Sequence, residues 1–63
     1  MKASILLSIA AVIAKTSMSR SGIYAAIKDG TFPKPVMIGA RRVAFIEEEV
    51  AEWIALKVAQ SRS

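Results

Sequence analysis

The first apolar stretch of the chain divides into a strand-like piece and a helical piece. Residues 5–7 are three consecutive large apolar residues and predict a short strand. Ser8 is a good helix N-cap, and the residues after it predict a helix over residues 9–15, which a polar Lys-Thr-Ser sequence ends. The apolar positions of this helix have the spacing of one buried face and are Ile9, Val12 and Ile13.

A second helix is predicted over residues 20–29, directly after a tight turn. Ser19 is suited to cap its start, and Gly30 is suited to the left-handed position that follows a helix end. Because only a short turn separates the two helices, residues 9–29 are typical of a helix-turn-helix. The second helix has an apolar face of Ile23, Ala26 and Ile27 and an opposite face of Arg20, Tyr24 and Lys28.

The rest of the chain predicts a hairpin and a longer third helix. Residues 31–35 contain two prolines and must be extended. Residues 36–38 and 43–45 alternate like strands, and residues 39–42 join them as a hairpin tip. The third helix is predicted over residues 47–59, with three glutamates in its first turn that complement the helix dipole. The predicted core includes Phe32, Phe45 and a buried stripe on this helix, which is Val50, Trp53, Ile54 and Val58.

This order of elements predicts a mainly α fold with a small β-hairpin, a winged helix-turn-helix of three helices plus a wing. The 63 residues are expected to form a single domain, residues 1–63, in which residues 1–4 and 60–63 are frayed. A domain of this size buries only about 60% of its unfolded surface, so its stability is expected to be marginal. The apolar content of 54% is well above that of a disordered chain, so the chain is expected to fold.

The composition excludes several kinds of chemistry. The chain has no cysteine and no histidine, which excludes disulfides, the usual zinc sites, and catalysis by Ser–His or Cys–His pairs. No pair of groups is placed to act as acid and base in a cleft, so we expect no enzyme activity, no cofactor and no metal. A small, basic chain that folds and lacks catalytic groups is typical of a binding module.

The positive charge is concentrated in one part of the chain. The net charge is +4 and the isoelectric point is near 10.0. Residues 1–46 contain seven Lys and Arg and one Asp, a net +6, whereas residues 47–63 contain two Lys and Arg and four Glu, a net −2. The first part is therefore suited to an anionic partner, either nucleic acid or an anionic membrane.

Four short motifs resemble one known family. They are MSRSGIY at residues 18–24, DGTFPKPV at residues 29–36, GARRVAF at residues 39–45 and EVAEWI at residues 49–54. Each motif is weak alone, but the four in this order and spacing resemble the AlpA family of prophage-encoded regulators and related small excisionases with a MerR-like winged helix. The resemblance covers residues 5–58. It implies a bacterial or phage DNA-binding protein that regulates prophage genes or assists excision.

The resemblance implies that a recognition helix, about residues 20–29, enters the major groove of double-stranded DNA by its N-terminal end. The hydroxyls of Ser19 and Ser21 suit a phosphate oxygen. Arg20 is the candidate for reading guanine, with a plain phosphate contact as its alternative. The other expected contacts along this helix are a phosphate for Lys28, a thymine methyl for Ala25, and for Tyr24 either a phosphate or packing against the wing.

The wing, about residues 36–45, is expected on the adjacent backbone or minor groove. Arg41 and Arg42 lie at its tip, and one of them is expected to face DNA because adjacent strand residues point to opposite faces. Lys34 is held between two prolines and is a candidate for either a phosphate or solvent. The chain has no Asn, so bidentate amide reading of adenine is essentially absent.

Two positions depart from the family pattern. Ser17 stands in the turn before the recognition helix, where the family usually has glycine, and serine at positive φ is strained. Gly22 stands where the family usually has threonine or serine, and glycine inside a helix costs about 0.5–1 kcal/mol relative to alanine. Both departures bear on how the helix docks on DNA.

Two alternative hypotheses about function remain beside DNA binding. The apolar run at residues 3–14 has about the length of a secretory h-region, so residues 1–14 could be the basis of an exported or membrane-surface peptide. The acidic last helix could make the chain a protein-interaction module that docks an integrase or RNA polymerase. The leading hypothesis predicts a cytoplasmic, nucleoid-associated bacterial protein without a membrane partner, and several copies on DNA because one small domain makes a small footprint.

Overall fold

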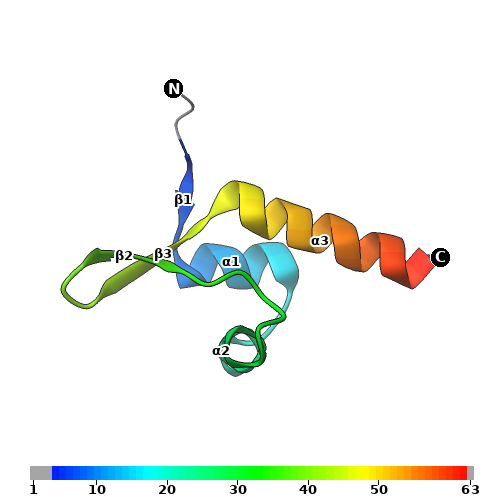
Figure 1. Ribbon diagram of the computed structural model, residues 1–63, viewed down its shortest axis with the longest axis horizontal. Coiled ribbons are helices and arrows are strands. Elements are labelled where there is room, and N and C mark those ends of the chain that lie inside the picture. The colour runs from blue at the N-terminus through cyan, green and yellow to red at the C-terminus, as the bar shows by residue number, and fades with distance from the viewer. Residues whose placement is uncertain (1–3, 63) are drawn as a thin grey trace.

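Three helices and a three-stranded antiparallel sheet make up the fold (Figure 1). The structure is a computed structural model that describes residues 4–62. The architecture is the predicted winged helix-turn-helix, in which a β-hairpin forms the wing. The elements in chain order are β1 (Leu6–Leu7), α1 (Ile9–Thr16), α2 (Arg20–Asp29), β2 (Val36–Gly39), β3 (Arg42–Ile46) and α3 (Glu47–Arg62).

Strand β3 is the centre of the sheet, with β1 on one side and β2 on the other. Leu7 lies opposite Phe45 on β3, and Val36 of β2 lies opposite Ala44. The predicted strand at residues 5–7 and the predicted hairpin are therefore both present, but they share one sheet, which the sequence pattern did not indicate. The sheet brings the start of the described chain next to the start of α3.

The two ends of α1 use backbone conformations that its sequence dictates. Ser8 caps the helix, and its side-chain oxygen accepts a 3.1 Å hydrogen bond from the N–H of Ala11. Ser17 follows the last turn in the left-handed region at φ 61°, and its N–H donates to the carbonyl of Ile13 at 2.8 Å. Ser17 is the one non-glycine residue between residues 4 and 62 with positive φ. The turn therefore has the positive φ at Ser17 that the family pattern implied.

The core forms where the three helices meet strand β3. Among residues 4–62, four side chains are fully buried, and one comes from each of these elements. Phe32, from the segment between α2 and β2, packs edge-on between Phe45 and Trp53, with ring centroids 6.0 and 4.8 Å away. The predicted core at Phe32 and Phe45 is confirmed, and the four fully buried residues are Val12, Ile23, Phe45 and Val50.

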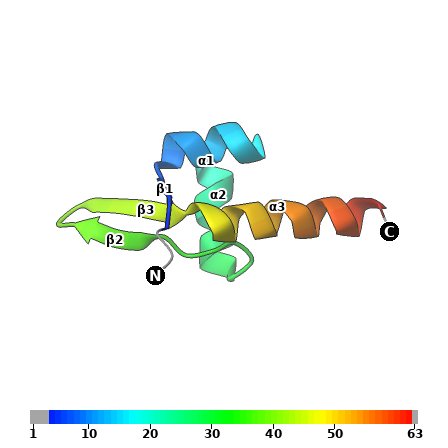
Figure 2. The ribbon, with the colours of Figure 1, turned by 90° about the horizontal axis from the view of Figure 1, so that it is seen from above.

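Helix α3 leaves the core part-way along its length. The prediction that Val58 belongs to the buried stripe is wrong, because 43% of this side chain is exposed. Every described residue after Ile54 is exposed, since the sheet and the other helices lie along the first half of α3 only (Figures 1 and 2). The helix also continues to Arg62, past the predicted end at residue 59, so residues 60–62 are helical; residues 1–3 and 63 lie outside the described residues.

The apolar stretch near the start of the chain is used by the fold. Leu7 and Val12 belong to the core cluster, and Ile9 and Ile13 pack against it. Between residues 4 and 62, no helix has the length and apolar character needed to cross a membrane. Residues 5–14 therefore have a structural role as β1 and the first turns of α1.

Candidate nucleic-acid interface

Helix α2 begins with a side-chain cap that fixes its first turn. The Ser19 hydroxyl oxygen accepts a 3.0 Å hydrogen bond from the N–H of Gly22 and lies 3.4 Å from the Ser21 hydroxyl oxygen. The predicted cap is therefore confirmed. The Ser19 oxygen is engaged as an acceptor, but the hydroxyl hydrogen can still be donated, so Ser19 can cap the helix and meet an anion at once.

Gly22 gives this cap room. A Cβ atom added at Gly22 would lie 3.1 Å from the Ser19 hydroxyl oxygen and 3.8 Å from the methyl carbon of Met18. The first of these contacts is tight, so a larger residue would have to displace the Ser19 side chain slightly. Glycine at this position therefore lowers intrinsic helix propensity but leaves the N-cap uncrowded.

The outer face of α2 is exposed. Ile23 is fully buried and sets the rotation of the helix about its axis. The other face therefore points outward, and 43% of the Tyr24 side chain is exposed. Gly30 ends the helix at φ 80°, as predicted. Each of the predicted contact residues on α2 lies on the exposed side, and they are Arg20, Ser21, Tyr24, Ala25 and Lys28.

A threonine holds the turn between α1 and α2. The Thr16 hydroxyl donates to the carbonyl of Val12 at 2.8 Å and accepts from the N–H of Met18 at 3.2 Å. These two hydrogen bonds hold the turn between α1 and α2, and Ser17 lies between the two bonded residues Thr16 and Met18. Sequence reasoning missed this role. A threonine in the last turn of a helix is the signal, because its hydroxyl can bond back to the carbonyl four residues earlier.

The wing presents its two arginines differently. Arg41 lies in the two-residue turn between β2 and β3, and Arg42 is the first residue of β3, opposite Gly39. The aliphatic stem of Arg42 passes within 3.6 Å of the position that a Cβ on Gly39 would occupy. The stem of Arg42 is therefore close to the neighbouring strand, whereas Arg41 is an exposed residue of the turn.

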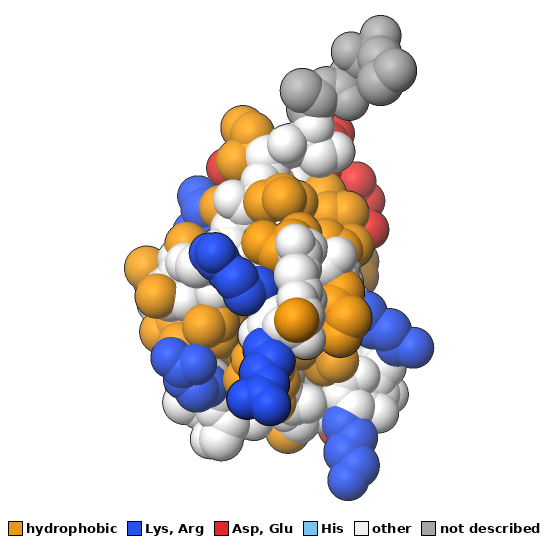
Figure 3. Space-filling view, turned by 90° about the vertical axis from the view of Figure 1, so that its left-hand side faces the viewer, with side chains coloured by type: hydrophobic (Ala, Val, Ile, Leu, Met, Phe, Trp, Pro, Cys, Tyr) orange, Lys and Arg blue, Asp and Glu red, His pale blue; other side chains and the backbone are white. Residues whose placement is uncertain are grey.

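Figure 3 shows the molecule from the end at which the wing lies, and basic side chains are spread over this face. Most of the acidic side chains in this view lie at its upper margin. Helix α2 runs across the line of α3, and the hairpin projects away from the helices (Figure 2). All nine predicted contact residues are exposed: Ser19, Arg20, Ser21, Tyr24, Ala25, Lys28, Lys34, Arg41 and Arg42.

The amino-acid sequence matches a known protein family. Residues 6–58 match the family described as prophage CP4-57 regulatory protein (AlpA). The chain belongs to this family. The match spans β1 through most of α3, so it includes all nine predicted contact residues of this AlpA-family chain.

The sequence of this AlpA-family protein is similar to those of two other proteins. The chain is 41% identical over 56 residues to the DNA-binding transcriptional activator AlpA of Escherichia coli (strain K12). The aligned region covers 79% of this chain and 80% of the relative. The chain is 43% identical over 42 residues to the uncharacterized protein ORF88 of Enterobacteria phage P4, which covers 67% of this chain. The aligned part is about half, 48%, of that phage protein. No solved structure matches the chain significantly.

Proposed function

We propose that this AlpA-family protein is a sequence-specific DNA-binding regulator of transcription. One observation carries the proposal: the exposed side chains of α2, the wing and the segment between them include five Lys and Arg, whereas the glutamates are on α3. This separation of charge suits a protein that presents one face to a polyanion. The similarity to a relative named as a DNA-binding transcriptional activator supports the same function.

In this proposal, the N-terminal end of α2 enters the major groove. Its first N–H groups have no partner within the helix, so together with the Ser19 and Ser21 hydroxyls they suit a phosphate oxygen. Arg20 follows directly and can present its fork to the O6 and N7 atoms of guanine. The remaining contacts are a thymine methyl for Ala25 and phosphates for Tyr24 and Lys28.

The wing and the extended segment supply the second set of contacts. Arg41 at the tip suits an adjacent minor groove, whose negative potential attracts a guanidinium group. Arg42 and Lys34 suit the phosphates on either side. These contacts place the protein on the duplex without reading bases, so specificity rests on Arg20, on Ala25 and on the shape of the DNA.

A footprint of the DNA that flanks the gene tests the proposal. Wild type is expected to protect a short site, and Arg20→Ala is expected to lose protection around one guanine. Replacing that guanine by 7-deazaguanine removes the N7 acceptor, so it should weaken wild type by about tenfold and Arg20→Ala hardly at all. Arg62→Ala is the matched control, because it removes the same charge at the far end of α3. Absence of protection by wild type would refute the proposal.

A salt titration tests the number of phosphate contacts. About five to seven contacts predict a slope near −5 in a plot of log affinity against log salt concentration. A slope shallower than about −2 would be incompatible with a protein that neutralises this many phosphates.

A further inference from the structure

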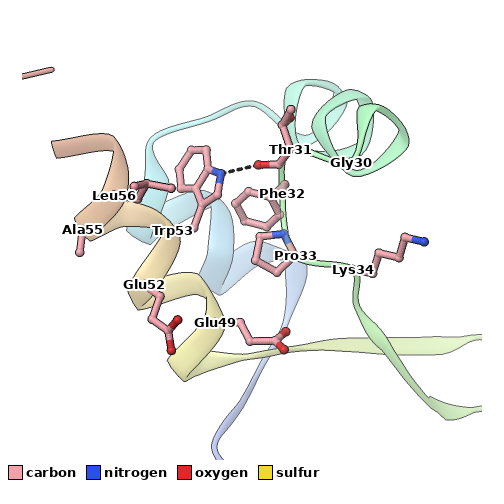
Figure 4. Close-up of a pocket in the computed structure, with 10 residues that line it drawn as sticks. All are labelled: Gly30, Thr31, Phe32, Pro33, Lys34, Glu49, Glu52, Trp53, Ala55 and Leu56. Atoms are coloured by element: carbon pink, nitrogen blue, oxygen red, sulfur yellow. Dashed lines mark hydrogen bonds between the residues drawn. The ribbon is translucent and has the colours of Figure 1, made fainter. Parts of the chain in front are cut away.

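A groove lies on the surface where α3 meets the segment that follows α2 (Figure 4). Its apolar lining includes Phe32 and Pro33 from the segment and Trp53 and Leu56 from the helix. Two carboxylates, Glu49 and Glu52, also line it. None of the nine predicted DNA contacts lines this groove except Lys34, so it is a second surface with a different chemistry.

The groove is formed before any partner arrives. The indole of Trp53 packs edge-on against Phe32, and its N–H donates to the carbonyl of Thr31 at 2.7 Å. Leu56, one turn further along α3, is 55% exposed. The fixed Trp53 ring and the exposed Leu56 can together contact one bulky apolar side chain of a partner. Burial of that side chain would contribute binding free energy, and the protein would not have to rearrange.

The charges around the groove favour a cationic occupant. Glu49 and Glu52 are exposed and lie three residues apart, so they share one side of α3. Lys34 points away from the groove in Figure 4, and the ammonium group of Lys57 lies 5.5 Å from the centre of the Trp53 ring. The carboxylates are therefore open to an outside cation, and they disfavour DNA on this side of the molecule.

We propose that this groove binds a basic segment of another protein. A bulky apolar side chain of that segment contacts Trp53 and Leu56, and its Lys or Arg side chains pair with Glu49 and Glu52. A second copy of the chain fits less well, because its basic surface is α2 and the wing, which the proposed function assigns to DNA. A separate basic segment leaves that surface free, so the protein can hold DNA and a protein partner together.

The test uses the full chain and a synthetic amphipathic peptide built from arginine and leucine. A peptide with glutamate in place of each arginine is its control. Trp53 is the only tryptophan of the chain, so its fluorescence reports directly on the groove. We expect a saturable fluorescence change with the arginine peptide and none with the glutamate peptide. Equal responses to both peptides, or no response to the arginine peptide, would overturn the proposal.

Substitutions on α3 locate the binding. Leu56→Asp and Glu52→Lys are each expected to weaken the arginine peptide by about tenfold, because one removes the apolar contact and the other an ion pair. Val58→Asp is the matched control, since Val58 is a similarly exposed apolar residue on roughly the opposite side of the helix. Equal weakening by Val58→Asp would contradict a site in the groove.

Two further measurements separate this proposal from its alternatives. Sedimentation of the wild-type chain that shows self-association, abolished by Leu56→Asp, would make a second copy the occupant and would overturn the proposal. The peptide assay contains no DNA, so its outcome is independent of the proposed DNA binding. Leu56→Asp is expected to keep the wild-type DNA footprint, which shows that the variant is folded and that the two surfaces act separately.

Discussion

The indole N–H of Trp53 donates a 2.7 Å hydrogen bond to the carbonyl oxygen of Thr31 and so joins α3 to the segment that follows α2. The Trp53 ring also packs on Phe32, whose own ring reaches Phe45 of the central strand. These contacts connect α2, the wing and α3 through one short segment. A residue of α3 therefore holds the segment that joins α2 to the wing.

Replacing Trp53 by phenylalanine isolates the hydrogen bond. The aromatic packing on Phe32 is largely kept, but the Thr31 carbonyl loses its donor, so we expect the free energy of unfolding to fall by about 1 kcal/mol. Urea denaturation followed by circular dichroism measures the change. Trp53→Ala, which also removes the ring, is expected to cost more. Equal stabilities of wild type and Trp53→Phe would show that the bond contributes nothing.

Glycine at position 17 is expected to stabilise the fold. Ser17 adopts φ 61°, a region that costs an ordinary residue energy and costs glycine nothing. Ser17→Gly should raise the free energy of unfolding by about 0.5–1 kcal/mol, after the added freedom of the unfolded chain is counted. Ser17→Val should lower it, because a β-branched residue is strongly disfavoured at positive φ. Thermal unfolding of the three proteins would reveal a reversed order if the strain were absent.

Two substitutions of Ser19 separate its structural role from its proposed contact with DNA. Ser19→Ala removes the cap on Gly22 and should cost about 1 kcal/mol of stability. Ser19→Asp keeps an equally good cap and adds a favourable charge at the helix start, so stability should be retained. The same carboxylate repels phosphate, so DNA affinity should fall sharply in Ser19→Asp. Wild-type affinity in Ser19→Asp would place this end of α2 away from the phosphates.

The two wing arginines are expected to differ in their effect on DNA binding. Arg41 is an exposed residue of the turn, whereas the stem of Arg42 lies close to Gly39 on the neighbouring strand. We therefore expect Arg41→Ala to weaken DNA binding more than Arg42→Ala, and only Arg41→Ala to reduce a preference for a narrow minor groove. Affinities for one site with A-rich or G-rich flanks measure both effects. A larger loss in Arg42→Ala would reverse the assignment.

The parts of the fold that were predictable from sequence depend on neighbours along the chain. Ser8, Ser19 and Gly30 have side chains or backbone freedom that act within one helical turn, and all three are where the sequence placed them. The positive φ at Ser17 was implied by the family resemblance, because the family usually has glycine in this turn. The five predicted contact residues on α2 could be assigned to its outer face because Ile23 fixes which side of α2 points inward.

The parts that were not predictable depend on distant residues. Val58 has the spacing of a buried position, but no other element reaches that part of α3, so its side chain stays exposed. The pairing of Leu7 with Phe45 and the bond from Trp53 to Thr31 join residues far apart in sequence. Apolar spacing gives the side of a helix that faces the core, but it does not give the length over which a core exists.

The attachment of α2 has a consequence for how such proteins diversify. The helix is held by Ser19 at one end, by Gly30 at the other and by the single fully buried side chain of Ile23 between them. The outward positions contribute little to the core, so new residues there should change the DNA sequence that is bound with little loss of stability. Under the proposed function, the chain is therefore expected to acquire a new DNA target by point mutation on the outer face of α2 while its small core is kept.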